Sequence, residues 1–211
     1  MAAEARPAFN GEVIMYKKQL RFQKIICLLC LIAAAVTFVY SLGILTDIYD
    51  GLFLATDPKK PTNDGRVAGS TIYYQMQEFN AQLVTFSIVL ILLAALLYLM
   101  NTHIRRKYYI GNYVSIGLFS VAGVACVVWS HIQIAAYKVQ YLTTVDFEAL
   151  KELCEMKNKP FIKSTLMLDL HYVVGAFLLL CVAGLVYNMI WKIRMMRAED
   201  ALLKAGEEAR V

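Results

Sequence analysis

Two groups of residues in this 211-residue chain have types and spacings that could do chemistry. The first is Cys27-Leu28-Leu29-Cys30, near the start of an apolar run. Two cysteines three residues apart can form a redox pair, supply half of a zinc site, or pack as small apolar side chains. A zinc site needs four ligands, and a redox pair needs further cysteines for exchange. Neither requirement is met at this depth, so packing at a helix interface is favoured, and a membrane thiol-redox protein is the third hypothesis for function.

The second group is polar and lies at the ends of the apolar runs that face away from the termini. It could form a polar mouth for a cation or a small solute, because polar groups within membranes tend to face the bundle interior. Solvation by water at the membrane interface is the favoured interpretation, since Asp169 and His171 point about 200° apart on a helix. We expect no metal and no cofactor. The group comprises Asp47, Asp50, Gln82, His131, Asp169 and His171.

Four apolar runs must position these residues. Hydrophobic residues make up 59% of the chain and charged residues 18%, which leaves too little polar surface for a water-soluble fold. Each run lacks Asp, Glu, Lys and Arg, and each reaches the length of about 20 residues with which a helix crosses a bilayer. We therefore predict an all-α integral membrane protein whose transmembrane domain covers 25–191. Its four spans are 25–45, 81–101, 113–137 and 171–191.

The basic residues predict the orientation of these spans. Thirteen of the 21 Lys and Arg residues flank the short connections and the termini, and the loops 46–80 and 138–170 hold the other eight. Because cytoplasmic segments carry an excess of Lys and Arg, we expect both termini in the cytoplasm and both loops outside, in the plasma membrane. The net charge of +5 then reflects topology and contact with membrane lipids, and no nucleic-acid partner is expected.

An offset of 89 residues aligns the two halves of the chain. It places "YLMNTHIR" (98–105) on "YNMIWKIR" (187–194) and keeps the helix ends and flanking arginines in step. Two tandem hairpin repeats of this kind would be related by an axis along the membrane normal. They would pack as an antiparallel four-helix bundle. A chance alignment of apolar helices with basic ends is the alternative.

Segments outside the spans also show helical patterns. We expect a cytoplasmic amphipathic segment over 1–24, a short amphipathic helix in the second outer loop, and a cytoplasmic helical tail over 192–211. The loop helix and the tail each carry an apolar stripe at a spacing of three to four residues. Such a stripe can contact a partner, lie on the bundle or on the membrane surface, or remain exposed to solvent. The stripes are Phe147, Leu150 and Cys154, and Met195, Ala198 and Leu202.

The chain carries no motif that is typical of an enzyme. Nucleotide-binding loops, nucleophile elbows and paired catalytic carboxylates are absent from the sequence. The middle of each span also lacks the charged residue that many ion-coupled carriers need. We predict a non-catalytic membrane protein that acts as a structural or accessory subunit, in a hetero- or homo-oligomer with other membrane protein subunits. The alternative is a translocator of ions or small solutes.

Overall fold

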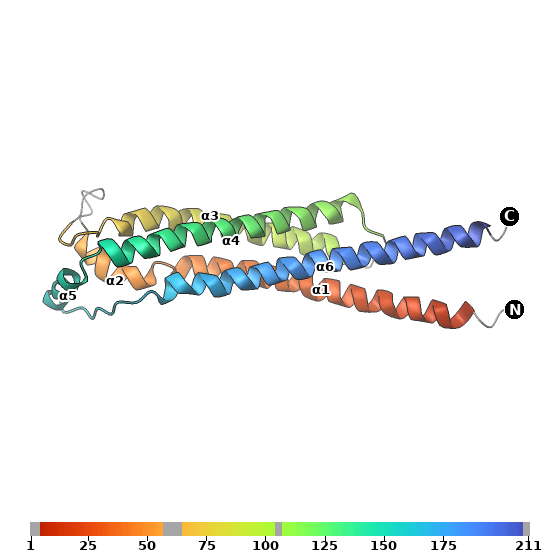
Figure 1. Ribbon diagram of the computed structural model, residues 1–211, viewed down its shortest axis with the longest axis horizontal. Coiled ribbons are helices and arrows are strands. Elements are labelled where there is room, and N and C mark those ends of the chain that lie inside the picture. The colour runs from red at the N-terminus through yellow and green to blue at the C-terminus, as the bar shows by residue number, and fades with distance from the viewer. Residues whose placement is uncertain (1–4, 57–64, 104–106, 209–211) are drawn as a thin grey trace.

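The computed structural model describes residues 5–56, 65–103 and 107–208 (Figure 1). Within these ranges the chain is all-helical and contains no strand. Six helices follow one another along the described chain. They are α1 (Ala5–Gly43), α2 (Thr46–Ala55), α3 (Ile72–Asn101), α4 (Ile110–Thr144), α5 (Phe147–Met156) and α6 (Leu166–Glu208).

Four of these helices are long and apolar enough to cross a membrane. This confirms the prediction of an all-α protein with four candidate transmembrane helices. Helix α6 has 43 residues, or about 64 Å at a rise of 1.5 Å per residue. The hydrocarbon layer is only about 30 Å thick, so a large part of α6 must extend beyond it. Helix α1 has 39 residues and includes, from Ala5 onward, the segment predicted as a separate amphipathic element.

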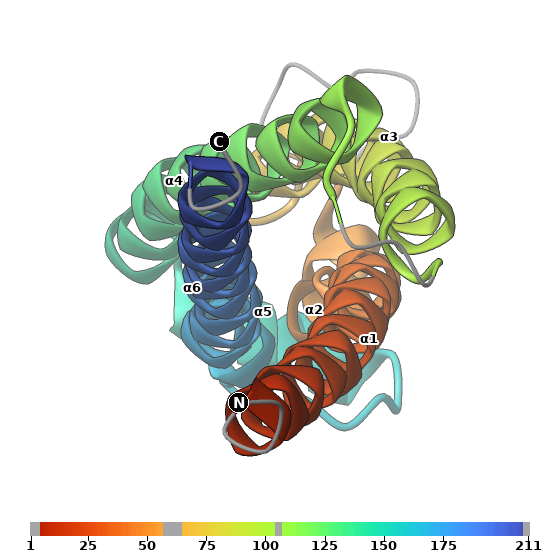
Figure 2. The ribbon, with the colours of Figure 1, turned by 90° about the vertical axis from the view of Figure 1, so that its right-hand side faces the viewer.

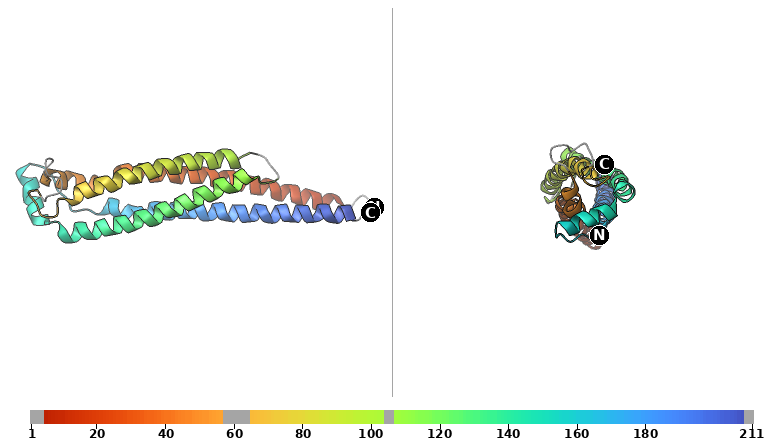
Figure 3. Two further views of the ribbon diagram at one scale, coloured as in Figure 1. Left: turned by 90° about the horizontal axis from the view of Figure 1, so that it is seen from above. Right: turned by 90° about the vertical axis from the view of Figure 1, so that its left-hand side faces the viewer.

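The four long helices lie side by side. Helix α1 packs against α3 and α6, and α4 packs against the same two helices; seen along the molecule, they stand around a common centre (Figure 2). Both termini lie at one end, here named the terminal end. The opposite end is named the capped end because α2 and α5 lie there, and α1 and α6 project past α3 and α4 at the terminal end (Figure 3).

Small residues bring the helix backbones close together, as is common within membranes. A Cβ atom added to Gly184 of α6 would lie 2.6 Å from Cδ1 of Ile26 on α1. One added to Gly123 of α4 would lie 3.2 Å from Cγ2 of Val182 on α6. Apolar side chains fill the space between the helices. The largest fully buried ones include Leu83, Leu90 and Leu97 on α3 and Ile116 on α4.

The short helix predicted in the second outer loop forms as α5. Its start follows from Asp146, whose carboxylate accepts hydrogen bonds from the backbone N–H groups of Glu148 and Ala149, each at 3.1 Å, and so caps the first turn. The helix packs against α2, which the sequence did not predict. Gly51 of α2 provides room here, since a Cβ atom there would lie 3.4 Å from Cδ2 of Leu150 on α5 and 2.9 Å from the ring of Phe161, which follows α5.

Candidate functional site

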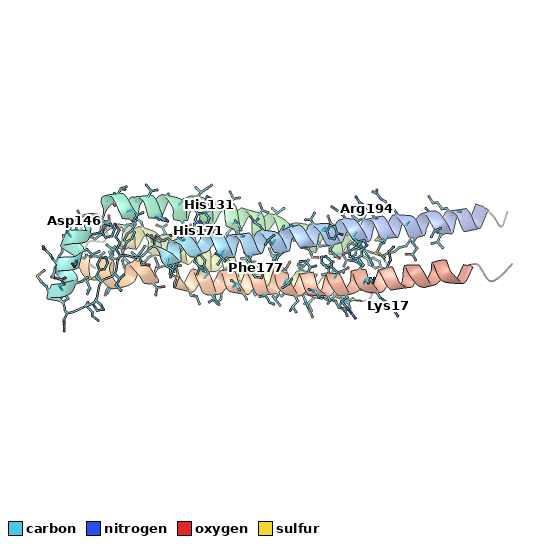
Figure 4. The ribbon with its side chains drawn as sticks, turned by 60° about the horizontal axis from the view of Figure 1, so that its bottom comes forward. Lys17, His131, Asp146, His171, Phe177 and Arg194 are labelled. Carbon is cyan, nitrogen blue, oxygen red and sulfur yellow. The ribbon has the colours of Figure 1, made fainter. Side chains whose placement is uncertain are left out.

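Two of the predicted polar residues meet near the capped end. Nδ1 of His131 on α4 lies 3.0 Å from Nε2 of His171 on α6 (Figure 4). Nδ1 of His171 faces the carbonyl oxygen of Leu168. Because a carbonyl oxygen only accepts, this Nδ1 carries the hydrogen, and in the neutral pair Nε2 of His171 accepts from Nδ1–H of His131. This histidine pair links α4 to α6.

The surroundings of the histidine pair determine what it can do. His171 is buried and His131 is exposed, and the Tyr172 ring lies 3.9 Å from the His171 ring and 5.5 Å from the His131 ring, between centroids. Each histidine therefore has the Tyr172 ring as an aromatic neighbour in addition to the other imidazole.

Asp169, two residues before His171, also contacts α4, through Lys138 rather than His131. Its carboxylate accepts a hydrogen bond from Nζ of Lys138 at 2.5 Å and another from Oγ1 of Thr165 at 3.0 Å. Because Lys138 lies on α4 and Asp169 on α6, this ion pair is a second link between the same two helices.

Of the remaining members of the predicted mouth, the structure describes only the side chain of Gln82. Gln82 is exposed on α3, where it lines an open groove of about 460 Å³ together with Glu78 and Phe86. Asp47 and Asp50 belong to α2, but their side chains lie outside the described part of the structure. The structure therefore leaves Gln82 apart from the histidine pair.

A small pocket with a mixed, mainly apolar lining lies beside His171, between the long helices. Its volume of about 20 Å³ gives room for one water-sized solute. On its α1 side, the hydroxyl of Tyr40 donates to the backbone oxygen of Met167 at 3.0 Å. The polar part of the lining consists of Thr37, Tyr40, Ser130 and His171.

A larger buried cluster, which the sequence-based prediction missed, lies toward the terminal end. Nε2 of Gln19 on α1 donates to Oδ1 of Asn188 on α6 at 3.0 Å and to Oε1 of Gln23 at 2.9 Å. The hydroxyl of Tyr108, in the connection between α3 and α4, donates to Oε1 of Gln23 at 3.1 Å. Burial raises the pKa of this hydroxyl, so it stays protonated as a donor.

The same cluster extends to α3 and α4. Nε2 of Gln23 donates to the backbone oxygen of Asn101 at the end of α3. Asn101 in turn donates to Oγ of Ser115 at 2.9 Å and accepts from Nδ2 of Asn112 at 3.2 Å, both on α4. These residues, named the amide network, join all four long helices. They are Gln19, Gln23, Asn101, Tyr108, Asn112, Ser115 and Asn188.

Two lysines make further contacts between segments beside the amide network. Lys192 of α6 is 1% exposed, and its Nζ lies 4.1 Å from the centroid of the Tyr16 ring, a cation–π contact. Lys107, before α4, pairs with Asp200 of α6 at 2.9 Å, and its hydrogen bond with that carboxylate raises the pKa of Lys107. The connection between α3 and α4 is thereby attached to the projecting part of α6.

The cysteines all lie in the interior and form no disulfide. Cys27 and Cys30 are fully buried on α1, and Sγ of Cys30 donates to the backbone oxygen of Cys181 on α6 at 3.8 Å. The two cysteines are thus in the packed interior near α6. Across the described residues, no group of three or more His, Cys, Asp or Glu side chains is placed to hold a metal ion.

The two predicted apolar stripes differ in exposure. In α5, Leu150 and Cys154 are buried within the cap and Phe147 is half-buried; the Phe147 ring meets Tyr141 edge to face at 5.2 Å between centroids. The exposed side of α5 is the charged one. In α6, by contrast, Met195 is half-buried and both Ala198 and Leu202 are exposed.

Comparison of the chain with protein-family models, curated proteins and solved structures finds no match. The fold defines the class on its own: an all-helical protein whose four long, apolar helices indicate a multi-pass membrane protein. Its function must be inferred from the surfaces and polar clusters described above.

Proposed function

We propose that this chain is a non-catalytic structural or accessory subunit of a membrane complex, and that it contacts its partner through the projecting part of α6. One observation carries the proposal. Leu202 and Leu203 are each 58% exposed, on a helix that extends past the ends of α3 and α4 (Figure 1). Exposed apolar side chains in such a place are typical of contact surfaces.

The apolar stripes of α5 and α6 differ in exposure, and this difference indicates which of them is the contact surface. The α5 stripe packs within the cap, so the chain itself covers most of that apolar face. The α6 stripe presents Ala198 and Leu202 on an exposed helix face, with the spacing by which a helix lies against a partner helix or groove. The partner in this proposal is another membrane protein subunit with a helix at the same level.

We further propose an antiparallel bundle of two tandem hairpins, with the terminal end in the cytoplasm of a plasma membrane. The exposed cations at the terminal end support this orientation. The repeat is supported by the 89-residue offset, which keeps the helix ends and flanking arginines of the two halves in step.

The experiment is gentle detergent extraction of the full chain from its native membrane, followed by native mass measurement. We expect an assembly heavier than the 23.8 kDa chain that contains a second kind of subunit. Leu202→Glu should dissociate it, because the change places a charge in the apolar contact. The matched control is Ile162→Glu near the capped end, where the side chain is 81% exposed. A monomer alone, or an assembly lost only in the control, would contradict the proposal.

A second candidate function, a translocator of small solutes or ions, is favoured by the small pocket beside His171, whose lining includes Thr37, Tyr40 and Ser130. In that case purified protein in liposomes should conduct a solute or ion, and His131→Ala should change the flux, because His131 is hydrogen-bonded to His171, which lines the pocket. Flux equal to that of empty vesicles would remove this candidate.

A further inference from the structure

An aromatic cluster marks the contact between α1 and α6 near the terminal end. The Phe22 ring of α1 lies 6.1 Å from the Tyr187 ring and 6.1 Å from the Trp191 ring of α6, between centroids. Tyr187 is 60% exposed, so the cluster reaches the surface of this helix pair. Tyrosine and tryptophan are enriched where a membrane protein passes from hydrocarbon to headgroups. The cluster therefore marks that boundary in the leaflet at the terminal end.

Two cations lie one helical turn beyond the aromatic cluster. Lys18 precedes Phe22 by four residues, and Arg194 follows Trp191 by three, so each shares a helix face with its aromatic neighbour. Both termini lie at the same end (Figure 1), and both steps therefore lead toward the terminal end. Lys18 and Arg194 are exposed. The contact between the two helices thus carries a cation on each side at the headgroup level.

These two cations have no carboxylate partner among the described side chains. The nearby Asp200 is engaged by Lys107 at 2.9 Å. Further exposed cations, Lys17 on α1 and Arg197 on α6, add to the positive charge. Figure 4 shows Lys17 and Arg194 at a similar level along the molecule, on different helices. Among the described side chains, no ion pair to Lys18 or Arg194 offsets this positive charge.

We propose that this surface binds an anionic phospholipid of the leaflet at the terminal end. Lys18 and Arg194 contact the phosphate oxygens of the headgroup, and Phe22, Tyr187 and Trp191 line its glycerol and upper acyl chains. Arginine suits this role because its planar guanidinium pairs with phosphate through two hydrogen bonds. From the terminal end toward the middle of the membrane, the cations come first and the aromatic rings second. This is also the order of the phosphate and the acyl chains in a lipid. The site requires only that the chain spans a membrane and is independent of any partner subunit.

The size of the expected lipid preference follows from the two charges. Each Lys or Arg near an anionic surface contributes a factor of about five in binding, and two together contribute about thirty. Phosphatidylcholine offers the same phosphate, but its quaternary amine cancels the charge. We therefore expect phosphatidylglycerol to bind between about five and about thirty times more tightly than phosphatidylcholine.

Tryptophan fluorescence can measure this preference directly. The chain has two tryptophans, so Trp129→Phe leaves Trp191 as the reporter within the site. The full chain is reconstituted in vesicles that contain phosphatidylglycerol or phosphatidylcholine with brominated acyl chains, and quenching is compared. We expect stronger quenching by brominated phosphatidylglycerol, and loss of that preference in Lys18→Gln/Arg194→Gln. The matched control, Lys157→Gln/Lys159→Gln, removes two exposed lysines near the capped end and should keep the preference.

A second measurement avoids the Trp129 substitution. The thermal midpoint of the otherwise unchanged protein in mixed micelles should rise more with phosphatidylglycerol than with phosphatidylcholine, and the excess should vanish in Lys18→Gln/Arg194→Gln. Equal quenching by both lipids, or a preference that survives this double substitution, would overturn the proposal. Displacement of the brominated lipid by millimolar inorganic phosphate would also overturn it, because it would show a site for free anions.

Discussion

Replacement of Asn101 by leucine tests whether the amide network holds the four helices together. Leucine has a similar volume, so the change removes polar atoms with little change of shape. It removes two hydrogen bonds between α3 and α4: the one donated to Ser115 at 2.9 Å and the one accepted from Asn112 at 3.2 Å. The bond from Gln23 remains, because it ends on the backbone oxygen of Asn101.

The magnitude can be worked out from these two bonds. Hydrogen bonds between helices within membranes contribute about 0.6 kcal/mol each on average and at most about 1.7 kcal/mol. Asn112 keeps its bond to the Met100 carbonyl at 2.7 Å, so its amide is not left without a partner. We therefore expect Asn101→Leu to lower the free energy of unfolding by about 1–2 kcal/mol.

The assay is unfolding of the purified chain in mixed micelles with increasing sodium dodecyl sulfate, followed by circular dichroism. Gln82→Leu is the matched control, since it makes the same kind of change on the exposed face of α3 and should shift the midpoint little. The reasoning would be refuted if Asn101→Leu unfolded at the wild-type detergent fraction, or if both substitutions shifted the midpoint equally.

Two further predictions concern a turn and an ion pair. Gly69 has a φ of +76°, and a Cβ atom there would lie 2.5 Å from the Thr144 carbonyl oxygen. Gly69→Ala should therefore lower the free energy of unfolding by at least about 1 kcal/mol, measured by thermal unfolding. The control Gly117→Ala, in open space within α4, should be neutral or slightly stabilising. The pKa of Lys107 is raised above 10.5 in the folded chain by Asp200, so the stabilisation from this pair should be complete below pH 10.5 and lost as the pH rises through the folded value. Titration of Lys107 followed by NMR should show the pKa returning toward 10.5 in Asp200→Asn, and an unchanged value would contradict the assignment.

The spans could be predicted because charge-free apolar runs of about 20 residues have few alternatives to a membrane helix. Their ends were less predictable. The first span was expected to end at Leu45, but α1 ends at Gly43 and a new helix starts at Thr46. Helix α2 has only a short signal in the sequence: Ile48 and Leu52, four residues apart, are both buried, and two residues are too few to define a helical period.

The sites depended more on three-dimensional packing. His131 and His171 were grouped because both lie at the ends of the apolar runs that face away from the termini. Their hydrogen bond, however, depends on how α4 and α6 are rotated about their axes, and no local sequence pattern specifies that rotation. The amide network was not predicted because Gln19 and Gln23 lie in the segment 1–24, which was expected to be a cytoplasmic amphipathic element outside the spans. An apolar stripe such as that of α5 likewise shows that a face must be covered, and only the fold shows that α2 covers it.

The most direct test of the accessory-subunit proposal is photocrosslinking in the native membrane. A photoreactive amino acid is placed at Leu202 in the full chain, with Leu180 as the matched position because its side chain is 71% exposed on the same helix. The account predicts an adduct of one defined mass, containing a different membrane protein, from position 202 and not from position 180. No protein adduct at 202, or the same adducts from both positions, would contradict it.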